Sequence, residues 1–210
     1  MTIVALPLAL PIQSQVFGLQ HYDVTNANED TGSSQTRVQA PARRLCTISS
    51  EDRITVLAEA ALWTSLMHAM DGQVNQVAVY SVLKPAPLGT ARGAWTAAST
   101  AVAGASTLVI NAGLGQVGKT VLQGDWIGVN QASTTDRQLL HVQSSAVVDN
   151  AGLVTVEFRA VLRVPVVAGS AIVWDRPTCL MRRTDSKTTW TDRRASQGGF
   201  TLDLIERWEP

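Results

Sequence analysis

The most recognisable chemical pattern in the chain lies between residues 113 and 120. These residues read GLGQVGKT, which matches the phosphate-loop pattern GxxxxGK[ST]. In a phosphate loop the backbone N–H groups surround the phosphates, the lysine neutralises them and the threonine holds Mg²⁺, which requires a helix that begins at the lysine. The next residues read VLQGDWIGV, which indicates a strand, a bend and a second strand. We therefore interpret the stretch as a glycine-rich hairpin loop and expect no cofactor at Gly113, Gly118, Lys119 or Thr120.

The titratable residues do not have the spacing of a catalytic or metal site. His21, His68 and His141 are far apart in the sequence, and the chain contains no GxSxG, HExxH or HxH motif. The carboxylate pairs Glu29-Asp30 and Glu51-Asp52 lie in polar stretches that are typical of solvated turns. These observations predict a protein that is not an enzyme and that binds no metal.

Tryptophan and arginine are the residues that would carry an interaction surface. Trp63, Trp126 and Trp174 fall within apolar patterns and are expected in a core, whereas Trp95 and Trp190 lie in polar connectors. The basic residues between 182 and 194 form either a solvated loop or a contact with an acidic neighbouring subunit. The interface candidates are Trp95, Arg182, Arg183, Trp190, Arg193 and Arg194.

One helix and many short strands must position these side chains. Apolar residues at three- and four-residue spacing predict an amphipathic helix over about 57–70, and Asp71-Gly72 provides its C-terminal stop. The residues around Val77 to Tyr80 predict a strand directly after it. We expect this helix to cover one face of a β-sheet in a mainly β protein.

The middle of the chain has the pattern of a separate small β-barrel. Strand-like runs recur at intervals of about ten to fifteen residues, and Asp149 to Gly152 is a turn signal. The predicted strands are 107–110, 121–129 with an interruption, 138–142, 153–158 and 171–174. A connector rich in Pro, Gly, Ala, Ser and Thr precedes them.

The two ends of the chain are expected to complete one outer domain. Asn26 to Thr36 has the composition of an exposed loop, and Phe200 to Trp208 alternates as a half-buried strand does. The simplest topology returns this last strand to the sheet under the helix. We therefore predict a discontinuous β-sandwich domain at 1–92 and 172–210, with a β-barrel inserted at 93–171.

Composition limits the classes of partner. Lysine plus arginine and aspartate plus glutamate balance at 17 each, so no net charge draws the chain to nucleic acid or to an anionic membrane. The longest apolar run, Ile3 to Leu10, is too short to span a bilayer and is predicted to be an opening extended segment. Cys46 and Cys179 are the two cysteines, and the sequence has no CxxC motif and no disulfide-dense pattern. They could pair if adjacent in space, but we expect two buried thiols.

Several stretches together resemble a known family. ALWTSLMHAMDGQVNQVAVY followed by KPAPLGTARG resembles the helix, strand and connector of distal tail proteins from bacteriophages with long flexible tails. GDWIGV, RQLLHV, VEFRAVLR and AIVWDRPTCLMRR, followed by FTLDLIERW, resemble that family's inserted β-domain and its return to the outer domain. The resemblance covers about Arg43 to Trp208.

The resemblance implies a function without catalysis. It implies a β-sandwich belt domain, six copies of which close into a ring that joins the tail tube to the tip or hub proteins. It places the protein in the tail tip of the virion, after assembly in the cytoplasm of a bacterial host. A second hypothesis is a carbohydrate-binding module that recognises host surface glycan through Trp95 or Trp126. A third is a nucleotide-binding protein that uses Lys119.

Overall fold

The computed structural model of the chain describes residues 2–27 and 33–207. In this part the protein is mainly β, with 44% strand and 8% helix, which confirms the predicted fold class. The carboxylates Glu29 and Asp30, and also Trp208, lie outside the described residues. In chain order the elements are β1 (Ile3–Ala5), β2 (Ser14–Ala27), β3 (Ser34–Ser49), α1 (Leu57–Met70), β4 (Gln76–Val79), β5 (Trp95–Ala97), β6 (Thr107–Asn111), η1 (Leu114–Gln116), β7 (Thr120–Val121), β8 (Trp126–Val129), β9 (Gln138–Val142), β10 (Ala146–Val147), β11 (Leu153–Arg159), β12 (Ala171–Ile172), β13 (Cys179–Arg183), β14 (Thr191–Arg193), β15 (Ser196–Gly198) and β16 (Thr201–Glu206).

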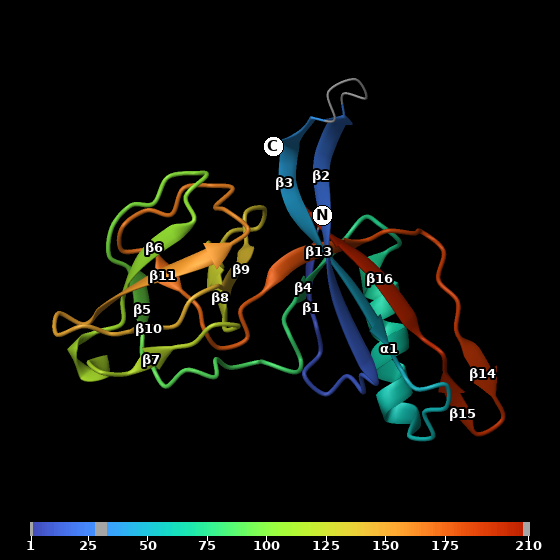
Figure 1. Cartoon of the computed structure of the whole chain (residues 1–210). Coiled ribbons are helices and arrows are strands. Elements are labelled where there is room, and N and C mark those ends of the chain that lie inside the picture. Colours follow the sequence, from blue (N-terminus) through green and yellow to red (C-terminus); the bar gives the residue numbers. More distant parts are fainter. Residues whose placement is uncertain (1, 28–32, 208–210) are drawn as a thin grey trace.

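The first large sheet, called the outer sheet, combines the two ends of the chain. Among the described residues its strand order is β1-β4-β13-β16-β3-β2, with β1 parallel to β4 and the other neighbours antiparallel. Strand β16 lies between β13 and β3, which confirms that the last predicted strand returns to this sheet. The outer sheet forms the centre of the molecule in Figure 1.

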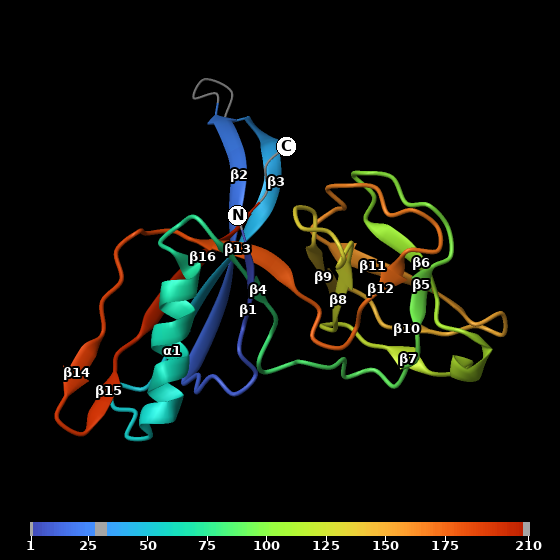
Figure 2. The same cartoon turned by 180° about the vertical axis from the view of Figure 1, so that it is seen from behind.

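Helix α1 packs its apolar side against the core of the outer sheet. It spans 57–70 as predicted and ends where Asp71 and Gly72 both adopt positive φ angles, 47° and 64°. Five of its residues are buried: Ala60, Trp63, Leu66, Met67 and Met70. Figure 2 shows α1 and the hairpin β14–β15 on one side of the central strands, and the second sheet on the other. The helix therefore closes a core that the sheet alone would leave exposed.

The second large sheet, called the insert, is formed by residues between the halves of the outer sheet. Its order is β12-β5-β6-β11-β9-β8 in the described structure, and a bridge between Gly128 and Val173 links β8 to the residue after β12, so the sheet nearly closes into a barrel. The five predicted strand regions are confirmed, whereas β5 and β10 were not predicted. The insert has its own apolar core. The division into domains at 1–92 with 172–210 and at 93–171 stays a prediction, and strand β12 of the insert sheet spans its second boundary.

The predicted turn at 149–152 shows why a glycine is required there. Gly152 donates its N–H to the carbonyl of Asp149 at 3.0 Å, and its φ angle is 77°. A Cβ atom at this position would lie 2.6 Å from the backbone of Gly113, in the loop after β6. The turn and the glycine-rich loop can therefore pack together only because Gly152 has no side chain.

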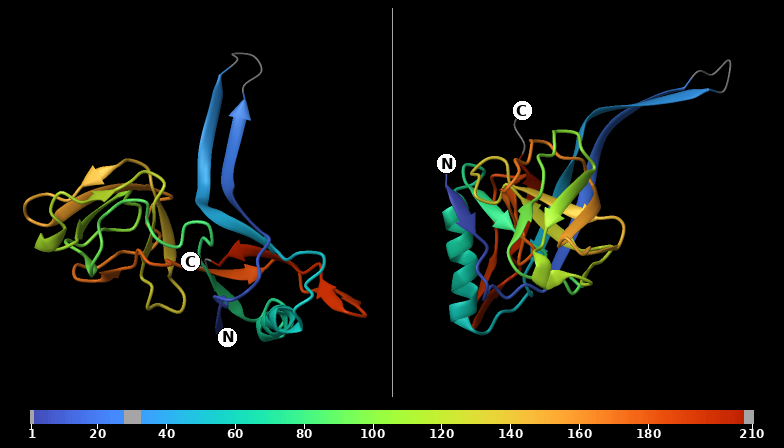
Figure 3. Two further views of the ribbon diagram at one scale, coloured as in Figure 1. Left: turned by 90° about the horizontal axis from the view of Figure 1, so that it is seen from below. Right: turned by 90° about the vertical axis from the view of Figure 1, so that its left-hand side faces the viewer.

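The prediction of an exposed loop over Asn26 to Thr36 is wrong at both ends. Strand β2 continues to Ala27 and β3 begins at Ser34, and residues 28–32 lie outside the described structure. These strands form a long hairpin that projects from the body of the molecule (Figure 3). Its side chains are exposed on both faces, so the sequence does not alternate and its polar composition is typical of a loop.

The two cysteines are free and buried, as predicted. Burial raises the pKa of the Cys46 thiol to about 12 and also raises that of Cys179 well above its ordinary value. We expect neither thiol of the folded protein to react rapidly with Ellman's reagent at pH 8, because the thiolate is the nucleophile. Two thiols should react at once in denaturant. Rapid reaction without denaturant would contradict the buried positions.

Candidate functional site

The glycine-rich stretch is a connection between strands. Strand β7 begins at Thr120, directly after Lys119, where a phosphate loop would need the start of a helix. The Gly118 N–H donates to the carbonyl of Val148 at 3.0 Å, and the Val148 N–H donates to the carbonyl of Lys119 at 2.9 Å. The strand, bend and strand are confirmed, but the hairpin is wrong, because β6 pairs with β5 and β11 while β7 pairs with β10.

Trp95 is not a surface residue, so its prediction as an interface residue is wrong. Its side chain is only 2% exposed and belongs to the core of the insert. The indole N–H donates to the carbonyl of Arg92 at 3.0 Å, and the ring packs against Trp174 at 6.3 Å between centroids. Trp95 and Ala97 both point inward from the short strand β5, whereas Thr96 between them is less buried. This alternation of apolar and polar residues was the feature of the sequence that could have predicted a buried Trp95.

The basic residues between 182 and 194 do not form one patch. Arg183 is buried and donates to the Thr188 hydroxyl and the Lys187 carbonyl, so its prediction as an interface residue is wrong. Arg182 is exposed on β13, while Arg193 and Arg194 are exposed on the hairpin β14–β15, well away from β13 in Figure 1. These three remain interface candidates.

Trp190 is half-buried beside the helix. Its ring packs against Phe200, with 6.0 Å between centroids, and against His68, also at 6.0 Å. It therefore contributes to the core of the outer domain, and only its outer edge remains an interface candidate.

The projecting part of the β2–β3 hairpin, called the arm, has no third strand beside it among the described residues. It comprises residues 20–27 and 34–43. Strand β16 pairs with β3 only from Leu45 to Ser49, so in the arm β3 pairs with β2 alone. Two contacts across the ribbon support it: the Arg43 guanidinium lies 5.7 Å from the Tyr22 ring centroid, and the hydroxyls of Thr25 and Thr36 are 2.9 Å apart.

The surface of the arm has an open strand edge and exposed apolar side chains. Strand β2 is the edge of the outer sheet, so its outer N–H and C=O groups have no neighbouring strand among the described residues. Val24 and Val38 are exposed apolar side chains on the arm, and Val16 and Leu19 are exposed at its base. A ribbon of two strands is marginally stable in water, so a partner along its edge or face would stabilise it.

A buried ionic cluster, called the latch, joins the arm base to the insert. The Nη2 atom of Arg163 lies 2.7 Å from Oε2 of Glu206 and donates to the carbonyl of Ala42 at 2.9 Å. The same Oε2 accepts the Arg44 N–H at 3.0 Å. The Arg44 side chain in turn donates from Nε and Nη2 to the carbonyl of Leu139, at 3.3 and 2.8 Å. Strands β3 and β16 are thereby tied to the insert.

Strand β9 of the insert also contributes to both apolar cores. The side chain of Leu139 packs in the core of the outer sheet, whereas Leu140 and Val142 pack in the core of the insert. The alternation of a strand explains this arrangement, since neighbouring residues point to opposite faces.

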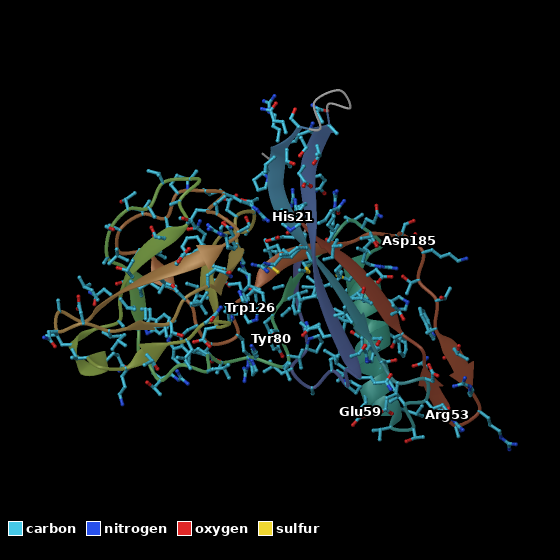
Figure 4. The ribbon with its side chains drawn as sticks, viewed as in Figure 1. His21, Arg53, Glu59, Tyr80, Trp126 and Asp185 are labelled. Carbon is cyan, nitrogen blue, oxygen red and sulfur yellow. The ribbon has the colours of Figure 1, made fainter. Side chains whose placement is uncertain are left out.

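A cleft of about 350 Å³, called the junction cleft, lies beside the latch. Its lining comes from β2 and β3 on one side and from β8, β9, the residue after β9, and β11 on the other. Figure 4 shows Trp126 on the side of the insert that faces the outer sheet. The eight lining residues are Phe17, Gly18, Leu19, Arg44, Trp126, His141, Gln143 and Arg159. Except for Trp126, none of them was predicted as a site residue.

His141 is the histidine that lies in this cleft, and its surroundings disfavour the charged form of its ring. Burial lowers its pKa, and the positive charges of Arg44 and Lys84 lower it further, against an opposing effect of Asp125. Gln143 donates from Nε2 to Nδ1 of His141 at 2.9 Å, so the ring carries its proton on Nε2. His21 lies on the arm and His68 on α1, so the three histidines are not brought together.

Comparisons with known proteins do not define a family for this chain. Neither the models of known protein families nor the sequences of curated proteins match it. In the described ranges, no group of three or more His, Cys, Asp or Glu side chains could hold a metal ion. Nor does any helix within residues 2–27 and 33–207 have the length and apolar character to cross a membrane.

Proposed function

We propose that this chain is a structural protein of a bacteriophage tail tip, which forms a ring between the distal end of the tail tube and the tip or hub proteins. The arm is the observation that carries this proposal. A two-stranded ribbon with an open edge and exposed valines is suited to pairing with another protein chain. The resemblance of residues 43–208 to distal tail proteins supports the same conclusion.

A ring requires contacts between two different surfaces of the subunit. Such heterologous contacts close when the rotation between neighbours divides a full turn. The arm is suited to be one of these surfaces because it projects beyond the body of the molecule (Figure 3). The number six, and the tube and hub as further partners, come from the resemblance alone.

Light scattering over a concentration series tests self-assembly. We expect the mass to rise from 22.5 kDa toward six times that value, without any effect of ATP and Mg²⁺. Val38→Lys places a charge on the arm, where the valine is 71% exposed, and should keep the chain monomeric. The matched control is Val102→Lys on the insert, where the valine is 66% exposed, and it should assemble as the wild type does.

Two outcomes would contradict the proposal. One is a wild-type chain that stays monomeric at every concentration and also when mixed with purified tail tubes. The other is equal assembly of the Val38 and Val102 variants, which would remove the arm from the interface.

A further inference from the structure

We propose that the junction cleft binds a small organic acid whose carboxylate is attached to a six-membered ring with an apolar face. The ring can belong to a free aromatic acid or to a uronic acid unit of an acidic polysaccharide, since both present an apolar face and a carboxylate. The proposal is independent of ring assembly, because it rests on the lining of the cleft and not on the arm.

The size and the apolar walls of the cleft indicate the ring. A volume of about 350 Å³ lies at the small end of the range for ligand sites, roughly 300–1,000 Å³. Phe17 and Leu19 from β2 and Trp126 from β8 provide the apolar surface. Aromatic side chains of this kind pack against the faces of aromatic rings and the apolar C–H faces of sugars.

Trp126 is held in place before any ligand arrives. Its ring has Arg44 at 4.6 Å from the centroid, His141 edge-on at 4.7 Å and Phe17 at 6.0 Å. An aromatic side chain that is fixed by packing loses little conformational entropy on binding. Trp126 can therefore act as a rigid platform at the floor of the cleft.

The polar groups of the cleft indicate a negative charge on the ligand. Arg44, Arg159 and the Nε2–H of His141 are hydrogen-bond donors, and no carboxylate is among the eight lining residues. Arg44 is buried, and its Nη1 atom has no hydrogen-bond acceptor within the described parts of the chain. Within residues 2–27 and 33–207, the ion pair of Arg159 is a loose, exposed one with Glu157, at 3.8 Å. A carboxylate would pair with these cations and would offset the cost of burying Arg44.

Calorimetric titration and ligand-observed NMR with four probes test the proposal on the full chain. The acids are benzoate and glucuronate, and their neutral counterparts are benzamide and methyl glucoside. We expect saturable binding of at least one acid at millimolar concentration, at least about tenfold tighter than its neutral counterpart. Preference for benzoate identifies a free aromatic acid as the source, and preference for glucuronate identifies an acidic polysaccharide.

Variants then locate the binding in the cleft. Arg159→Gln removes an exposed charge and should weaken binding about tenfold, whereas Arg194→Gln on the distant hairpin should not change it. Trp126→Leu should abolish binding; if this variant does not fold, the Arg159 comparison still decides. Val38→Lys should bind as the wild type does, which separates ligand binding from assembly. Absence of binding by both acids, equal binding of the neutral probes, or an unchanged affinity in Arg159→Gln would overturn the proposal.

Discussion

Replacing Glu206 with glutamine is expected to lower the free energy of unfolding by about 3–5 kcal/mol, the usual effect of removing one partner of a buried ion pair. The side chains of Arg163 and Glu206 are 6% and 1% exposed, so water cannot reach Arg163 to solvate its charge once the carboxylate is removed. Glutamine keeps the size of the side chain but leaves Arg163 and Arg44 as two buried cations. Burial already lowers the pKa of Arg44, and Glu206 is the first group that opposes this effect. Chemical denaturation with urea measures the change.

A second glutamate on the insert provides the matched control. Glu157 lies 3.8 Å from Arg159, and the two side chains are 47% and 59% exposed. Exposed ion pairs contribute little, so Glu157→Gln should change the stability by no more than about 1 kcal/mol. Equal effects of the two substitutions would show that the latch does not hold the domains together.

Trp63→Ala is expected to cost about 3–5 kcal/mol of stability, because it leaves a cavity under α1. The Trp63 ring is fully buried and lies stacked on Phe200, with centroids 5.6 Å apart and planes 8° from parallel. Its indole N–H donates to the carbonyl of Pro11 at 3.0 Å, which also ties the segment before β2 to the helix. The same denaturation experiment applies.

Leu57 on the same helix is the control for Trp63. It is 66% exposed, so Leu57→Ala should be nearly neutral. Trp63→Phe separates the two contributions of the indole, because it retains most of the packing and removes the hydrogen bond. A small loss for Trp63→Ala would mean that the helix does not cover the outer sheet in solution.

The elements that could be predicted from the sequence each bury one face over several residues. Helix α1 has a repeated apolar side and a left-handed stop at Asp71, and β16 alternates Leu202 and Leu204 with exposed residues. Such patterns reflect local periodicity, which a single sequence contains. The strands of the insert were predictable for the same reason.

The features that could not be predicted depend on tertiary contacts or lack a buried face. The arm is exposed on both sides, so nothing in its sequence separates a ribbon from a loop. Trp95 and Arg183 lie in stretches of polar composition, and their burial is decided by neighbours from other strands. The junction cleft brings Phe17 together with Trp126 and His141, residues more than a hundred positions away that no local pattern connects.

Strand β9 also has a consequence for how the molecule unfolds. It belongs to the insert by hydrogen bonding, yet through Leu139 and the Arg44 contact it is also part of the outer core. Separating the two sheets would expose Leu139 and leave Arg163 and Glu206 without each other, so neither sheet can open without cost to the other. We therefore expect the two domains to unfold together, because a load on the insert reaches the outer sheet both through strand β9 and through the latch.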